Sequence, residues 1–158
     1  IAENMAVARP GASRLEVEEA AKMAAIHDDI LRFPQGYDTP VGEKGITLSG
    51  GQRQRVAIAR SLLADSSLLL LDDALSAVDT GTETNILEHL DELRASRPEL
   101  SAIIASHRLS AVVNADLIVV LKNGRVVESG NHDTLLELDG WYASQWRYQQ
   151  LEASIDAS

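Results

Sequence analysis

A chain of 158 residues that is 45% hydrophobic and 24% charged can bury one moderate core, which fits one globular domain or most of one. Its formal net charge of −10 argues against binding to nucleic acid or to an anionic lipid surface. The absence of cysteine excludes disulfides and thiol catalysis, and no apolar run approaches the ~20 residues of a membrane span. Any membrane role would therefore depend on a missing segment or on a partner.

The first part of the chain has helical patterning. Apolar residues recur at spacings of three and four from residue 15 to residue 31, which predicts one amphipathic helix that Ser13 opens and residues 34–38 end. Residues 49–64 predict a second helix, with Val56, Ala59 and Leu63 on its packed face.

From about residue 67 onward, strands and helices alternate. The short apolar runs predict strands that are covered on both faces, at residues 67–71, 101–105 and 117–121. Residues 80–94 predict the crossover helix between the first two strands, which makes that pair parallel. Residues 122–125 predict a hairpin turn that leads into a further strand at 126–128.

The start of the second helix has the residues of an anion site. Ser49 is a good N-cap, and the unpaired N–H groups and the dipole of the first turn favour a bound phosphate. Gly50 and Gly51 let a phosphate approach the backbone closely. Taken alone, this pattern is also typical of an ordinary helix start.

Three further motifs follow this segment. They are an apolar run that ends in Asp72 and Asp73, residues 76–79 with the sequence Ser-Ala-Val-Asp, and Ser106 with His107 after another apolar run. In this order they resemble the ATP-binding cassette of ABC transporters, with its signature, Walker B strand, D-loop and switch histidine. The resemblance extends from residue 1 to about residue 152.

The resemblance implies an α/β, P-loop NTPase-like fold. We expect a helical signature subdomain at residues 1–66, part of a mostly parallel sheet with flanking helices at residues 67–135, and a C-terminal helix and tail at residues 136–158. None of the lysines follows a glycine, so these residues contain no P-loop. The sequence is therefore expected to be the C-terminal part of a cassette. Its strands would lack neighbours and expose apolar faces, and the fragment alone would be inactive with negligible ATP affinity.

The resemblance also assigns ligands and roles. The signature, which consists of Leu48, Ser49, Gly50, Gly51 and Gln52, would bind ATP together with D-loop residues Ser76 and Asp79. Asp72 would hold Mg²⁺ at the end of its strand. His107 would contact the γ-phosphate. The alternatives are a strand-terminating turn for Asp72, an ordinary surface histidine for His107 and a simple turn for the D-loop.

Asp73 departs from the family pattern, in which a glutamate polarises the attacking water. Aspartate is one methylene shorter, and a general base must come within about 2.6–3.2 Å of its proton. We therefore expect a site that binds ATP and hydrolyses it slowly, unless the backbone shifts to compensate. In the family, two cassettes share two ATP sites. An intact signature beside a weakened Walker B site resembles one half of a heterodimer whose partner carries the glutamate. A homodimer is the alternative.

A loop before the signature resembles the contact of exporters with the coupling helices of the membrane domain; the residues are Val41, Gly42, Glu43, Lys44 and Gly45. The whole pattern predicts an ATPase domain of a multidrug-type or lipid-type exporter at the cytoplasmic face of the inner or plasma membrane. One alternative is a soluble cassette that acts as a binding or regulatory module. Another is a structural half whose nucleotide never turns over.

Overall fold

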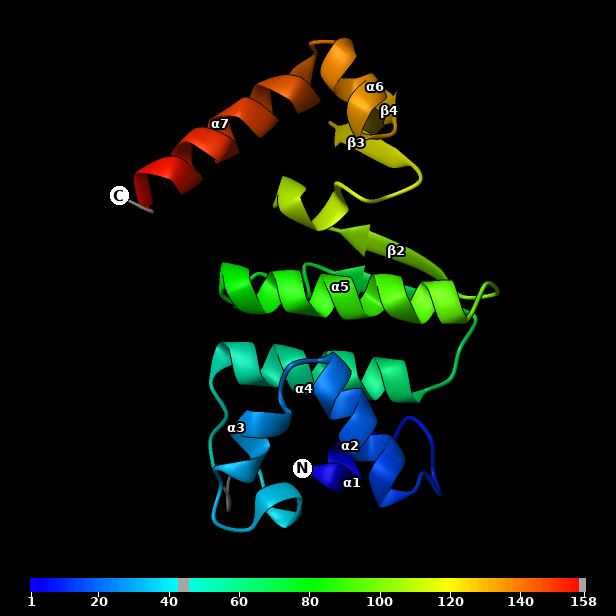
Figure 1. The fold of residues 1–158 in the computed structure, drawn as a ribbon, viewed down its shortest axis with the longest axis vertical. Helices are drawn as coiled ribbons and strands as arrows, with labels where there is room; N and C mark the ends of the chain where they lie inside the picture. The colour runs from blue at the N-terminus through cyan, green and yellow to red at the C-terminus, as the bar shows by residue number, and fades with distance from the viewer. Residues whose placement is uncertain (43–45, 157–158) are drawn as a thin grey trace. The chain divides into compact units, whose positions relative to one another are not determined.

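The computed structural model describes residues 1–42 and 46–156, and the chain divides into two compact units, Ile1–Ala105 and Ser106–Ser158. The mixed α/β class predicted from the sequence is confirmed (Figure 1). The predicted division of this chain after residues 66 and 135 stays a prediction.

The first unit contains five α-helices, a short 3₁₀ turn and two strands among its described residues. They are α1 (Ala2–Ala6), α2 (Arg14–Met23), α3 (His27–Leu31), η1 (Gly36–Asp38), α4 (Gly50–Leu63), β1 (Leu68–Asp72), α5 (Thr80–Ser96) and β2 (Ser101–Ala105). Helices α1 and α2 both pack against α4, and α2 also reaches α5. The helix that carries the signature is therefore the centre of this unit.

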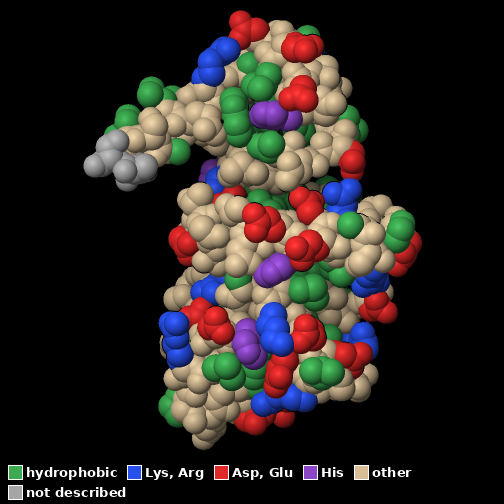
Figure 2. Space-filling view, in the orientation of Figure 1, with side chains coloured by type: hydrophobic (Ala, Val, Ile, Leu, Met, Phe, Trp, Pro, Cys, Tyr) green, Lys and Arg blue, Asp and Glu red, His purple; other side chains and the backbone are tan. Residues whose placement is uncertain are grey.

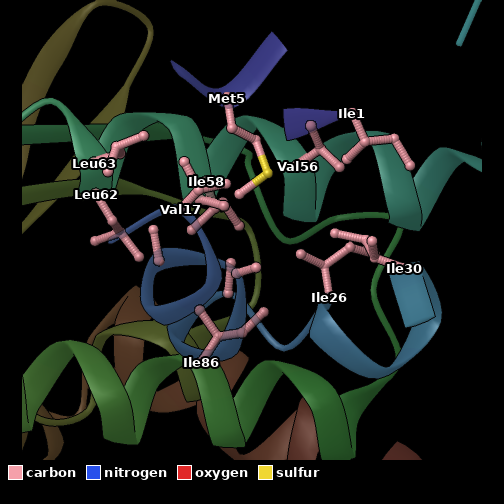
Figure 3. Packing of buried hydrophobic residues seen from close by; sticks show 14 of the residues in the cluster. Ile1, Met5, Val17, Ile26, Ile30, Val56, Ile58, Leu62, Leu63 and Ile86 are labelled. Carbon is pink, nitrogen blue, oxygen red and sulfur yellow. The ribbon is translucent and has the colours of Figure 1, made fainter. Parts of the chain in front are cut away.

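The core of the first unit lies where these helices meet. Figure 3 shows Met5 of α1, Val17 of α2 and Ile58 of α4 converging, with Ile86 reaching up from α5. Met5 and Ile86 are fully buried. Each such side chain contributes about 1.5–3 kcal/mol of burial free energy. The core thus fixes α4, and with it the signature, against its neighbours.

The prediction of one helix over residues 15–31 is wrong, because α2 ends at Met23 and α3 begins at His27. Ser13 does cap α2, through a reciprocal capping box with Glu16. The break is a Schellman motif, in which Ala25 donates to the Lys22 carbonyl, Ile26 donates to the Ala21 carbonyl, and Ala25 has a φ of 51°. Apolar spacing continues through this break, so periodicity alone does not reveal it.

Replacing Ala25 by glycine is expected to stabilise the protein by about 0.5–1 kcal/mol. Glycine adopts the left-handed conformation without the steric cost that alanine carries, and this gain exceeds the extra chain entropy that glycine loses. Urea unfolding of the cassette measures the change. The matched control is Ala20→Gly inside α2, which should destabilise by about 1 kcal/mol or more. A destabilised Ala25→Gly variant would contradict the motif.

Strands β1 and β2 pair in parallel, with Asp72 opposite Ala105, and α5 is the crossover helix as predicted. Among the described residues, only one face of β1 is covered. Leu68, Leu70 and Ile103 are 46%, 64% and 58% exposed. The prediction that these strands are covered on both faces is therefore wrong for this chain, and the expected exposed apolar face is present.

The second unit is a hairpin with helices. Its elements are η2 (Leu109–Val112), β3 (Ile118–Lys122), β4 (Arg125–Gly130), α6 (His132–Glu137) and α7 (Trp141–Asp156). Strands β3 and β4 are antiparallel, and Asn123 and Gly124 between them both have positive φ, which confirms the predicted hairpin turn. A separate core contains Leu109, Leu135 and Tyr142.

Within residues 1–42 and 46–156, every helix is too short or too polar to cross a lipid bilayer. Acidic and basic side chains are interspersed over the face shown in Figure 2. On that face, the acidic side chains are spread out and do not gather in one patch.

Candidate functional site

The signature forms a capped helix start, as predicted. Ser49 has extended backbone, and its Oγ accepts from the Gln52 N–H at 3.2 Å. In return, Gln52 Oε1 accepts from the Ser49 N–H at 3.0 Å. Neither bond uses the N–H of Gly50 or Gly51, which lie in the first turn of the 14-residue helix α4. This is a geometry in which helix N–H groups and the helix dipole favour an anion.

Leu48 has a packing role in addition to its place in the signature. Its side chain is buried in the core of the first unit, and its carbonyl accepts from Arg53 Nη1 at 2.7 Å. These contacts hold the residue that precedes the helix cap. A direct contact of Leu48 with nucleotide stays a prediction.

The two signature glycines face the D-loop, residues 76–79. A Cβ on Gly51 would lie 2.7 Å from the Ala77 carbonyl oxygen, which is closer than real Cβ contacts allow. A Cβ on Gly50 would lie 3.6 Å from the Ala77 Cβ, an ordinary contact. Gly51 is therefore required by the fold of this chain as well as by the phosphate chemistry predicted from sequence.

Gln54 is a site residue that sequence reasoning missed. Its Nε2 donates to Ser76 Oγ at 2.9 Å and to the Asp73 carbonyl at 3.4 Å, and its Oε1 accepts from the Ala77 N–H at 2.9 Å. One side chain of α4 thus binds both the D-loop and the residue after the Walker B aspartate. No local pattern marks Gln54, because its partners lie 19 to 23 residues away.

Asp72 is the last residue of β1, as predicted, and both it and Asp73 are exposed. Asp73 has a φ of 47°, and its N–H donates to the Ala105 carbonyl at 2.9 Å. Aspartate tolerates this left-handed conformation better than most residues. The backbone that carries the two carboxylates is therefore anchored to β2.

The donor set at the end of β1 fits Mg²⁺ held together with a nucleotide. Among the described residues there is no group of three or more His, Cys, Asp or Glu side chains that could form a complete metal cage. Mg²⁺ in phosphate sites commonly takes one or two carboxylates and completes its shell with phosphate oxygens and water. An exposed Asp72 at the carboxyl end of a parallel strand matches that requirement.

Asp79 caps helix α5. Its two carboxylate oxygens accept from the Thr82 N–H and from the Thr82 hydroxyl, both at 2.9 Å. These bonds, with the backbone N–H first, lower the pKa of the Asp79 carboxyl below its ordinary value. The cap is therefore at full strength above the ordinary aspartate range and is lost as pH falls through the lowered pKa. A contact with a second cassette stays a prediction for both Asp79 and Ser76.

His107 lies in the second unit, with an exposed side chain. We use "switch loop" for residues 106–108. The Arg108 N–H donates to Ser106 Oγ at 3.0 Å, and the His107 carbonyl accepts from Gln149 Nε2 at 2.9 Å. Gln149 also accepts from the Leu109 N–H at 2.9 Å. Sequence reasoning missed Gln149, because these partners lie 40 and 42 residues away.

A cavity of about 680 Å³ lies beside the predicted coupling loop; its lining includes Val41, Gly42, Leu48, Arg53 and Arg60. Val41 forms a bridge with Ile46 across the loop. Glu43, Lys44 and Gly45 lie outside the described residues. The described flanks of the predicted loop thus border a hollow with apolar and cationic walls.

Comparisons with known proteins identify the family of this chain. A family model described as "ABC transporter" matches residues 2–76. The Multidrug resistance-like ATP-binding protein MdlA of Escherichia coli (strain K12) is 51% identical over 99% of this chain. The ATM1-type heavy metal exporter of Novosphingobium aromaticivorans is 51% identical over 96% of it. ATP-binding cassette sub-family B member 6 of Homo sapiens is 50% identical over 95% of it.

The chain spans only 26%, 24% and 18% of the lengths of these three relatives. A solved structure, described as a bacterial Atm1-family ABC exporter with ATP bound, matches 94% of this chain with a TM-score of 0.82 and 51% identity, and the match covers 25% of that chain. Fold and sequence therefore agree along nearly the whole length, and this chain belongs to the ATP-binding cassettes of the ABC transporter family.

Proposed function

We propose that this chain binds and hydrolyses ATP as part of an exporter, in which two cassettes close around ATP and separate after hydrolysis. One observation carries the proposal: three motifs of the first unit are bound to one another. The capped start of α4, the D-loop and the end of β1 form one assembly, held by the Gly51–Ala77 approach and by the Gln54 hydrogen bonds.

The residues divide the chemistry between them. Asp72 would supply a carboxylate to Mg²⁺, and that ion would offset charge on the phosphates. Asp73 would orient the attacking water, and the exposed imidazole of His107 would donate to the γ-phosphate. The N–H groups of Gly50 and Gly51 at the start of α4 would bind phosphate of the ATP held mainly by a second cassette.

The site built on this chain is proposed to be the slower one. The Asp73 backbone is anchored through its N–H to Ala105, which limits how far it can move to compensate for the shorter side chain. A misplaced general base lowers the rate by about 10²–10⁴-fold. We therefore favour a heterodimer in which the partner supplies the glutamate and this chain's signature completes the faster site.

The membrane domain is proposed to dock at the cavity beside Val41 and Gly42. Arg53 and Arg60 place positive charge in its lining, and Val41, Ile46 and Leu48 provide apolar surface. These walls suit a short amphipathic coupling helix that carries acidic residues. We propose accordingly that the cassette works at the cytoplasmic face of the membrane. The names of the relatives differ in cargo, so no transported substrate is assigned.

Membrane extraction of the full-length protein separates an exporter from a soluble regulatory module. An exporter subunit remains in the membrane pellet after alkaline carbonate washing and turns over ATP once reconstituted in lipid. A soluble module would be released by the wash. Retention in the pellet without any ATP turnover, tested with a partner cassette present, would instead favour the structural half.

A further inference from the structure

Gln149 binds the backbone on both sides of Arg108. Its amide nitrogen donates to the His107 carbonyl and its amide oxygen accepts from the Leu109 N–H, both at 2.9 Å. A carbonyl and an N–H two residues apart are the pair that a neighbouring strand would bind. The primary amide satisfies both at once, with one donor and one acceptor. This contact fixes the backbone that carries the His107 imidazole.

Helix α7 holds Gln149 in place. At its start, the Glu128 carboxylate accepts from the N–H groups of Trp141 and Tyr142 at 2.6 and 3.0 Å. Tyr142 is fully buried, and its hydroxyl lies 2.8 Å from His132 Nδ1. Gln149 follows Tyr142 by about two helical turns, so both lie on the same side of α7. The helix is a rigid support between a buried anchor and the switch loop.

The loop is also anchored from its other side. Leu109 is buried in the same core as Tyr142, whereas the His107 side chain is exposed. Burial of Leu109 fixes the start of η2, and Gln149 fixes the carbonyl two residues earlier. The imidazole is therefore held by its backbone while its ring remains accessible. That is the arrangement needed for a side chain that must meet a phosphate oxygen.

We propose that Gln149 is a positioning residue for His107, and that α7 thereby sets how well the cassette distinguishes ATP from ADP. The inference rests on the proposed function, in which His107 contacts the γ-phosphate. ADP lacks that phosphate, so loss of the Gln149 contact weakens ATP binding and leaves ADP binding nearly unchanged. A displacement of about 1 Å is enough to lose most of a directed hydrogen bond.

The test uses the full-length protein in complex with its partner cassette. The P-loop lysine of the partner is replaced by alanine, which weakens nucleotide binding at the other site. The measured binding then reports the site that contains Asp72. Gln149→Ala is compared with Gln150→Ala, which removes the same side chain from the exposed next position of α7. We expect Gln149→Ala to lower the preference for ATPγS over ADP about tenfold, while Gln150→Ala leaves it within about twofold. In a His107→Ala background, Gln149→Ala should have no further effect.

Hydrogen exchange tests the contact itself, without nucleotide. The Leu109 amide should exchange faster in Gln149→Ala than in wild type, and Gln150→Ala should match wild type. Equal ATPγS and ADP losses, or effects of Gln149→Ala that add to those of His107→Ala, would overturn the proposal. So would Gln149→Ala and Gln150→Ala proteins that behave alike. A wild-type complex that binds neither nucleotide would instead refute the proposed function.

Discussion

Replacing Asp73 by glutamate is expected to raise ATP turnover at the site built on this chain by about 10²-fold. The longer side chain extends the carboxylate toward the water while the Ala105 hydrogen bond keeps the backbone in place. The measurement uses the full-length complex with glutamine in place of the partner's Walker B glutamate, so that turnover reports this site alone.

The same substitution has a predicted structural cost. Asp73 has a φ of 47°, and glutamate tolerates the left-handed region less well, at a cost of about 1 kcal/mol. A slightly lower melting temperature should therefore accompany the faster turnover. Asp73→Asn is the control and should show no gain. If Asp73→Glu leaves turnover unchanged, Asp73 does not limit the rate.

Replacing Gly51 by alanine is expected to lower ATP turnover of the complex by about 10²-fold or more. The new methyl group would meet the Ala77 carbonyl at 2.7 Å, so either α4 or the D-loop must move. Overpacking of this kind costs about 1–3 kcal/mol of stability. Turnover and urea unfolding, measured on the same preparation, give both effects.

Gly50→Ala is the matched control for Gly51→Ala. Its methyl group would lie at an ordinary 3.6 Å from the Ala77 Cβ, so the unfolding free energy should stay within about 0.5 kcal/mol of wild type. A Gly51→Ala protein with wild-type stability and turnover would show that the D-loop does not need its present approach to α4.

Local patterns in the sequence predicted the elements that depend on local interactions. The Ser49 and Gln52 capping box needs only residues three apart, so the start of α4 was predictable. The Asn123-Gly124 turn likewise follows from backbone preference. The break at Ala25 was missed because the position that favours glycine in a Schellman motif is occupied by alanine.

Contacts between distant segments explain what the sequence could not show in the candidate site. The carboxylates, the signature and the switch histidine were identified by motif. Gln54 and Gln149 were missed because each acts through partners brought near only by the fold. The predicted covering of β1 on both faces needs a second packing layer, and within the described residues Leu68 and Leu70 remain exposed.

ATP turnover of the full-length protein, alone and with a partner cassette that carries the Walker B glutamate, tests the central claim most directly. We expect turnover only with the partner, and we expect Gly51→Ala in this chain to lower that turnover by about 10²-fold or more, because this signature completes the partner's site. Equal turnover without the partner, or turnover with the partner that Gly51→Ala leaves intact, would contradict the shared and asymmetric site.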